Sequence, residues 1–238
     1  MVAYRVDGNP RIEAAARLVE PLVKNGSAVA DIGCGIGIVA ERLGKRFPGA
    51  QIIGVDISPC NIEYARRTIS LPNVQFLEAS ATEQFDRLLE RVPTGFDTII
   101  LMDVIEHIPA DQRPNLFANI SRLATADASM VLTYPSPEYQ QYLMEENPSE
   151  LQLIDNVIDI QAILAETAPL DWKLKFFSYI DVWHYNQYVH AVFVRSLGSS
   201  PKPPEPSTLF QRIASRIDRA IFRPRRLKKY AEKPFSNE

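Results

Sequence analysis

Runs of apolar, often β-branched residues alternate along the chain with segments in which apolar positions recur every three or four residues. The runs have the length and composition of buried strands, and the periodic segments have the spacing of amphipathic helices. The pattern predicts strands at Ala28–Ile32, Gln51–Asp56, Val74–Ala79, Asp97–Met102, Ser129–Tyr134, Lys173–Tyr179 and Tyr188–Arg195. It predicts helices at Arg11–Lys24, Ile36–Phe47, Asn61–Ser70, Thr82–Arg91 and Arg113–Ala124. Such alternation is typical of a mostly parallel sheet covered by helices.

The last two predicted strands have no helix between them. Only residues 180–187 separate them, which is too short for a parallel crossover, so we expect an antiparallel hairpin. The fold class that follows is α/β: three αβα layers around a seven-stranded, mostly parallel sheet that ends in an antiparallel C-terminal hairpin. These elements lie within residues 1–198, which we expect to form one domain.

Composition indicates an ordinary globular chain. Its 238 residues are 46% hydrophobic and 23% charged, which excludes collagen-like, fibrous and fully disordered proteins. The sequence has no run of about 18 apolar residues and no signal-peptide pattern at its start, so we expect a cytoplasmic location. The two cysteines, Cys34 and Cys60, fit a reducing compartment, and without a CxxC pair we expect no metal site.

Charge is unevenly distributed. Residues 199–238 hold ten of the 26 Lys and Arg side chains but only four of the 29 Asp and Glu side chains, a net charge of +6. The preceding 198 residues therefore carry a net charge of −9. An acidic body is a poor match for a phosphate backbone, so we expect no nucleic-acid partner.

The basic end of the chain has two parts. Residues 199–208 are rich in proline and serine and predict a semi-rigid linker. Within residues 209–238, the segment Leu209–Phe222 places apolar residues at helical spacing with arginines opposite, and a basic run, RRLKK, follows. This predicts an amphipathic helix, and three alternatives remain for what the segment does. The helix contacts the inner face of an anionic membrane through residues 209–229, or it docks on the domain or on a second subunit. In the third alternative the segment is disordered.

A glycine-rich turn carries the most specific chemistry. The first predicted strand runs into DIGCGIG, which contains Gly33, Gly35 and Gly37. Glycines allow a sharp turn next to a helix N-terminus, and Asp56, about 20 residues further on, occupies a position that binds ribose in nucleotide-binding folds. A dinucleotide site needs a further glycine where Ile38 stands, and Asp31 repels a pyrophosphate. The turn predicts a ligand with a cationic end, and the alternative is a tight turn without a ligand.

DIGCGIG, GVDIS and FDTIILMDVIEHIP together make residues 25–195 resemble the class I S-adenosylmethionine-dependent methyltransferases, which have a Rossmann-like fold. The resemblance implies S-adenosyl-L-methionine as cofactor, with its amino acid end at the glycine turn and its ribose at Asp56. The cofactor-binding residues that it implies are Asp31, Gly33, Cys34, Gly35, Gly37, Asp56, Ile57, Ala79, Ser80, Met102 and Asp103. The third strand departs from the family's pattern, because Ser80 stands where an acid is usual.

Asp103, Glu106 and His107 follow the fourth predicted strand, at the carboxyl edge where α/β sheets bind ligands. A histidine there is suited to deprotonate a hydroxyl, so we predict His107 as the catalytic base. In the alternative interpretation His107 only organises the loop. The three residues also resemble part of the metal motif of small-RNA 2′-O-methyltransferases, which leaves a metal-dependent RNA enzyme as an alternative.

Two late segments, Tyr134–Pro148 and Ile180–Gln187, are rich in aromatic and amide side chains and are expected to recognise the acceptor. The candidates for stacking on a ring are Tyr139, Tyr142, Trp183, His184 and Tyr185, unless they only pack over the sheet. The resemblance implies methyl transfer, which we predict to an oxygen of a hydroxylated small molecule such as a sugar or lipid-linked glycan. A non-catalytic scaffold that only binds the cofactor is the remaining alternative.

Overall fold

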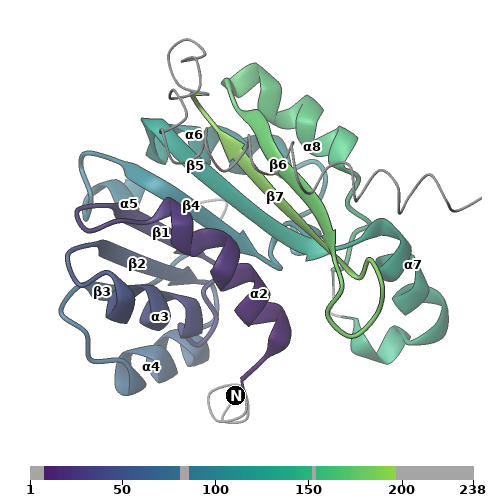
Figure 1. Ribbon diagram of the computed structural model, residues 1–238, viewed down its shortest axis with the longest axis horizontal. Coiled ribbons are helices and arrows are strands. Elements are labelled where there is room, and N and C mark those ends of the chain that lie inside the picture. The colour runs from purple at the N-terminus through teal and green to yellow at the C-terminus, as the bar shows by residue number, and fades with distance from the viewer. Residues whose placement is uncertain (1–7, 81–85, 152–153, 197–238) are drawn as a thin grey trace, which may run out of the picture. The chain divides into compact units, whose positions relative to one another are not determined.

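A seven-stranded sheet organises the described part of the chain. The computed structural model describes residues 8–80, 86–151 and 154–196. The strands are β1 (Ala28–Ile32), β2 (Gln51–Asp56), β3 (Val74–Glu78), β4 (Phe96–Met102), β5 (Ala124–Pro135), β6 (Lys173–Ile180) and β7 (Tyr188–Val194). Their order in the sheet is β3-β2-β1-β4-β5-β7-β6 (Figure 1). The chain divides into two units, Met1–Leu197 and Gly198–Glu238.

The sheet confirms the predicted fold class. Strands β1 to β5 pair in parallel, whereas β7 runs antiparallel to both β5 and β6. Each predicted strand lies within a residue or two of an observed one, except that β5 begins at Ala124, five residues earlier than expected. That first part of β5, ATADA, consists of small residues and one acid and is partly exposed, so it lacks the large apolar side chains of the buried half.

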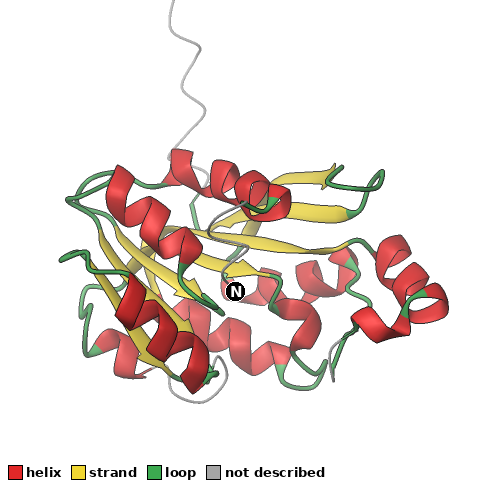
Figure 2. Cartoon of the chain, turned by 90° about the horizontal axis from the view of Figure 1, so that it is seen from below, coloured by secondary structure: helices red, strands yellow, loops and turns green. Residues whose placement is uncertain are grey.

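Helices cover both faces of the sheet, as Figure 2 shows. They are α2 (Pro10–Val19), α3 (Ile38–Arg46), α4 (Pro59–Thr68), α5 (Asp86–Leu89), α6 (Arg113–Leu123), α7 (Pro137–Glu146) and α8 (Ile160–Thr167). Buried side chains of α2, α3 and α4 share one hydrophobic core with the sheet. Those of α5, α6 and α8 share the core on the opposite face. Among the described residues, no helix has the length and apolar character to cross a membrane.

Helices α7 and α8 were not predicted from the apolar pattern. Helix α7 has the sequence PEYQQYLMEE, whose polar and aromatic residues are also typical of a loop. Its start is fixed by Ser136, whose hydroxyl accepts from the Tyr139 amide, and by Pro137 in the first turn. Helix α8 begins after Asp159, whose carboxylate accepts from the Gln161 amide. These two caps were the signals available in the sequence.

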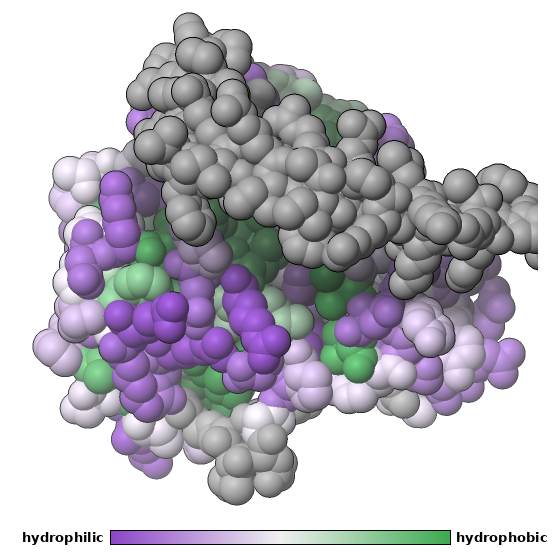
Figure 3. All heavy atoms as spheres, viewed as in Figure 1, coloured by the Kyte–Doolittle hydropathy of each residue, from purple (hydrophilic) through white to green (hydrophobic). Residues whose placement is uncertain are grey.

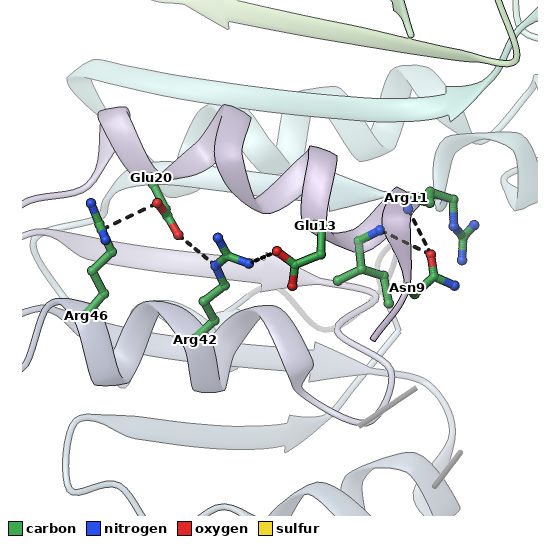
Figure 4. A network of polar contacts seen from close by, with 7 residues as sticks. Asn9, Arg11, Glu13, Glu20, Arg42 and Arg46 are labelled. Carbon is green, nitrogen blue, oxygen red and sulfur yellow. Dashed lines mark hydrogen bonds and ion pairs between the residues drawn. The ribbon is translucent and has the colours of Figure 1, made fainter. Parts of the chain in front are cut away.

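Ion pairs fix α2 against α3 (Figure 4). The guanidinium of Arg42 contacts Glu13, and its Nε donates to Glu20 at 2.7 Å. Arg46 reaches the second oxygen of Glu20 at 3.4 Å. Figure 3 shows hydrophilic side chains gathered over this region. Because α2 is held in this way, its first turn lies beside the carboxyl edge of the sheet, where it lines the cavity described below.

Candidate active site

A cavity of about 680 Å³ opens at the carboxyl ends of β1, β4 and β5. Seven predicted site residues line it: Asp31, Gly33, Cys34, Gly35, Met102, Asp103 and His107. The other predicted residues, Gly37, Asp56, Ile57, Ala79 and Ser80, are not among its lining residues in the described part of the chain. The structure therefore brings the glycine turn and the residues after β4 to one site.

The three glycines of the turn have different roles. All three adopt positive φ angles, between 54° and 76°. A Cβ at Gly33 would lie 2.3 Å from Val104, and one at Gly37 would lie 2.6 Å from Phe76, so packing requires both glycines. A Cβ at Gly35 would meet nothing within 4 Å. Gly35 therefore faces open space in the cavity, where a ligand can approach the backbone.

Asp31 is a buried acid aimed at this space. Its side chain belongs to β1, the residue is 2% exposed, and Oδ2 has no hydrogen-bond partner among the described residues. Burial raises the pKa of Asp31 to about 7, and the nearby carboxylate of Asp56 adds to the shift. A buried carboxylate without a partner is unfavourable, and a ligand ammonium group is the natural partner for it.

Asp56 holds the glycine turn to the start of α4. Its Oδ2 accepts from the Gly35 amide at 2.8 Å, and its Oδ1 accepts from the Ser58 amide at 2.8 Å and from the Asn61 side chain at 3.3 Å. The Ala79 amide donates to the Asp56 carbonyl oxygen, which places the end of β3 beside it. Ile57 is 73% exposed next to Asp56, as a residue that contacts a flat ring would be. The ribose and adenine assignments stay predictions.

Replacing Asp56 by alanine tests the ribose assignment. Loss of charge-assisted hydrogen bonds worth roughly 1.5–3 kcal/mol is expected to weaken binding of S-adenosylhomocysteine about ten- to a hundredfold. Calorimetry measures the affinity, and circular dichroism shows whether the variant is folded. Unchanged affinity in a folded variant would remove Asp56 from the cofactor site.

Asp103 lines the same cavity as Asp31 and comes immediately after β4. Its backbone has a positive φ of 52°, which is uncommon for a residue other than glycine and frequent at functional sites. Its carboxylate forms an ion pair with Arg11, whose guanidinium lies 5.6 Å from the centre of the Tyr188 ring. Sequence reasoning missed Arg11, because an arginine in the first turn of an amphipathic helix is indistinguishable from a solvated one.

His107 is held in one orientation. Its Nδ1 lies 2.7 Å from the Ile154 carbonyl oxygen and 3.1 Å from Oδ1 of Asp155. A carbonyl oxygen only accepts hydrogen bonds, so Nδ1 carries the proton and Nε2 is the basic nitrogen of the neutral ring. The side chain of Asn156 donates to the carbonyl oxygens of Glu106 and Ile108, which fixes the loop. A ring oriented in this way is suited to act as a general base, and the catalytic assignment of His107 stays a prediction.

Glu106 lies beside His107 and is almost fully buried. Its Oε1 is 3.9 Å from Nε2 of His107, and its Oε2 has no hydrogen-bond partner among the described residues. Burial raises the pKa of Glu106 well above its ordinary value, and the neighbouring Asp103 adds to the shift.

Within the described ranges, no group of three or more His, Cys, Asp or Glu side chains is arranged to hold a metal ion.

Four of the five predicted aromatic residues divide into two sets, and the fifth, Tyr185, is 90% exposed and is not among the described lining residues of the cavity. Tyr139 and Trp183 line the cavity, together with Tyr188, which was not predicted. His184 stacks on Tyr139 with 5.8 Å between ring centres. Tyr142 also stacks on Tyr139, at 6.0 Å. Stacking of this kind supports the packing interpretation for His184 and Tyr142, and leaves Tyr139 and Trp183 as candidates for acceptor contact.

Part of the chain matches a known protein family. A family described as "Methyltransferase domain" matches residues 29–127, from β1 into the beginning of β5. This match agrees with the resemblance of the sequence to the class I S-adenosylmethionine-dependent methyltransferases. The matched segment contains the glycine turn, Asp56 and His107. It ends before α7 and the β6–β7 loop, which supply Tyr139 and Trp183.

Solved structures share the fold. A TehB-like methyltransferase from Corynebacterium glutamicum is 21% identical, with 76% of this chain and 87% of that chain covered and a TM-score of 0.57. Magnesium protoporphyrin IX methyltransferase from Synechocystis, with bound S-adenosylhomocysteine, is 18% identical, with 78% and 82% covered and a TM-score of 0.60.

Curated relatives match over a shorter segment. A ubiquinone biosynthesis O-methyltransferase from Paracidovorax citrulli is 32% identical over 87 residues, 35% of this chain and 34% of the relative. One from Neisseria meningitidis is 38% identical over 85 residues, with the same shares covered. The match therefore spans about a third of the length of these relatives.

Proposed function

We propose that this chain transfers a methyl group from S-adenosylmethionine to an oxygen of a hydroxylated small molecule. The observation that carries the proposal is the position of two groups in one cavity. Asp31 offers a buried acid to a cationic ligand end, and His107 offers a basic Nε2. The similarity to proteins named as O-methyltransferases supports oxygen as the acceptor atom.

The residues present fit the cofactor. Oδ2 of Asp31 has no partner among the described residues and suits the ammonium group of the cofactor, and the open space at Gly35 lets the cofactor approach the backbone. When bound, S-adenosylmethionine supplies an electrophilic methyl group on a sulfonium sulfur. With the cofactor bound, His107 would accept at Nε2 the proton of the acceptor hydroxyl whose oxygen takes the methyl group. Asp155 then stabilises the imidazolium through Nδ1. Positioning in the cavity contributes the rest of the rate enhancement.

A sugar or another hydroxylated ring is the acceptor class that we propose. Tyr139 and Trp183 provide aromatic surfaces at the cavity, and Gln140 provides an amide beside them. Aromatic rings with a few placed polar groups are typical of sites for small polar ligands.

Methyl-labelled S-adenosylmethionine tests the function. Incubation with a small-molecule extract of the source cells is expected to give labelled products that resist mild alkali, as methyl ethers do. The control is Asp31→Asn, which is expected to give little product. Loss of transfer on chelation, with RNA as the acceptor, would favour the metal-dependent RNA enzyme. Cofactor binding without transfer to any compound would favour the scaffold.

A further inference from the structure

Besides Asp31, three residues that line the cavity each have a buried polar atom without a hydrogen-bond partner among the described residues. One is Nε of Arg11, whose guanidinium already forms an ion pair with Asp103. The other two are Oε2 of Glu106 and Nε2 of Gln140. Glu106 is 2% exposed and Gln140 is 1% exposed, and both residues line the cavity. Buried polar groups are rarely left unpaired in folded proteins, because the lost hydrogen bonds to water are not replaced. Oε2 of Glu106 and Nε2 of Gln140 therefore indicate that a ligand in the cavity supplies their missing hydrogen-bond partners.

Glu106 lies beside the base, and Gln140 lies on α7 next to Tyr139, a candidate for acceptor contact. Glu106 precedes His107 in the short helix Ile105–His107, and Gln140 follows Tyr139 in α7. The amino acid end is expected at Asp31 and Gly35, after β1. A ligand that reaches Glu106 and Gln140 is therefore the acceptor.

The chemistry of the two groups defines what they bind. The amide nitrogen of Gln140 only donates hydrogen bonds. Burial keeps the carboxyl of Glu106 protonated to higher pH than usual, and a protonated carboxyl also donates. Both groups therefore require an accepting atom on the ligand, such as a hydroxyl, ether or carbonyl oxygen. The 3.9 Å between Nε2 of His107 and Oε1 of Glu106 places this atom close to the hydroxyl that reacts.

We propose that Gln140 and Glu106 form a subsite for a second oxygen of the acceptor, next to the oxygen that is methylated. This rests on the proposed function and narrows its acceptor to compounds with neighbouring oxygen atoms. Gln140 is a specificity-determining residue in this proposal. A site built to hydrogen-bond a substrate oxygen discriminates strongly against an analogue that lacks it, because its own polar groups then stay unpaired.

The first test needs no acceptor. Gln140→Met keeps the length and helix propensity of the side chain but removes the unpaired amide. In the ligand-free protein this change is expected to raise the melting temperature by about 2–4 °C. The matched control is Gln141→Met, at the next position of α7, where the side chain is exposed and donates to Glu145. The control is expected to leave the melting temperature nearly unchanged. A lower melting temperature for Gln140→Met would show that the amide is structural and would overturn the proposal.

The second test uses two pairs of probes, catechol with phenol and cyclohexane-1,2-diol with cyclohexanol. Formation of S-adenosylhomocysteine gives kcat and KM for each probe. The native protein is expected to favour a diol over its monohydroxy partner by at least about 100-fold in kcat/KM. Gln140→Met is expected to reduce this preference at least about tenfold, mainly through KM of the diol, while Gln141→Met retains it.

The outcomes separate the two proposals. Equal use of a diol and its monohydroxy partner, or an unchanged preference in Gln140→Met, would overturn the subsite while methyl transfer stands. Transfer to compounds of the cell extract that contain a single oxygen would also overturn it. If no compound is methylated, the proposed function fails, and the subsite fails with it.

Discussion

Replacing His107 by alanine is expected to lower the turnover of methyl transfer about 10²–10⁴-fold, the usual contribution of a general base. The reason is geometric: the Ile154 carbonyl and Asp155 hold the proton on Nδ1, so Nε2 is the nitrogen that accepts the proton of the hydroxyl. The measurement is kcat at saturating cofactor and acceptor. Calorimetry with S-adenosylhomocysteine is expected to show nearly unchanged affinity.

His184→Ala is the matched control for this prediction. His184 stacks on Tyr139 but is not among the described lining residues of the cavity, so most of the turnover is expected to survive. If His107→Ala weakens cofactor binding but retains turnover at saturation, His107 organises the loop and another group takes the proton.

The sheet and the glycine turn were predictable because local sequence determines them. Strand β1 is buried along its whole length, so it is apolar apart from Asp31, and the positive φ angles of the turn favour glycine. Short apolar runs of this kind mark buried strands of a parallel sheet. An acid inside such a run is conspicuous, which is why Asp31 was identified from the sequence.

The acceptor side was less predictable, because it is assembled from distant segments. Arg11 reaches Asp103 from α2, 92 positions earlier in the chain, and Asp155 reaches His107 from a stretch with no regular pattern. Gln140 stands on a helix whose polar sequence resembles a loop. Contacts of this kind depend on tertiary packing, which local periodicity does not encode.

The predicted linker and basic helix at residues 199–238 lie outside the described residues, and their membrane contact stays a prediction.

Asp31 is expected to make cofactor binding depend on pH. A ligand ammonium group pairs with the ionised carboxylate, and burial sets the pKa of Asp31 at about 7 in the ligand-free protein. Below pH 7 each unit is therefore expected to weaken binding of S-adenosylhomocysteine about tenfold, because a proton must leave before the ion pair forms. At higher pH the affinity is expected to fall again, once the α-amino group of the ligand loses its charge. Affinity is expected to peak between these two titrations.

Asp31→Asn is expected to remove the pH dependence of binding below pH 7. It is also expected to weaken binding at pH 7.5 about 10²–10³-fold, the effect of removing one partner from a buried ion pair.

The same change is expected to stabilise the ligand-free protein at pH 7.5. The carboxyl ionises near pH 4 when unfolded but near pH 7 when folded. The folded state thus binds more protons in this range, and its stability falls as pH rises from about 4 to about 7. Asp127→Asn, on the exposed part of β5, is the matched control and is expected to change neither property. Calorimetry between pH 5.5 and 8.5, with melting curves at the same pH values, measures both. A native affinity that does not vary with pH would show that Asp31 does not hold the ammonium group.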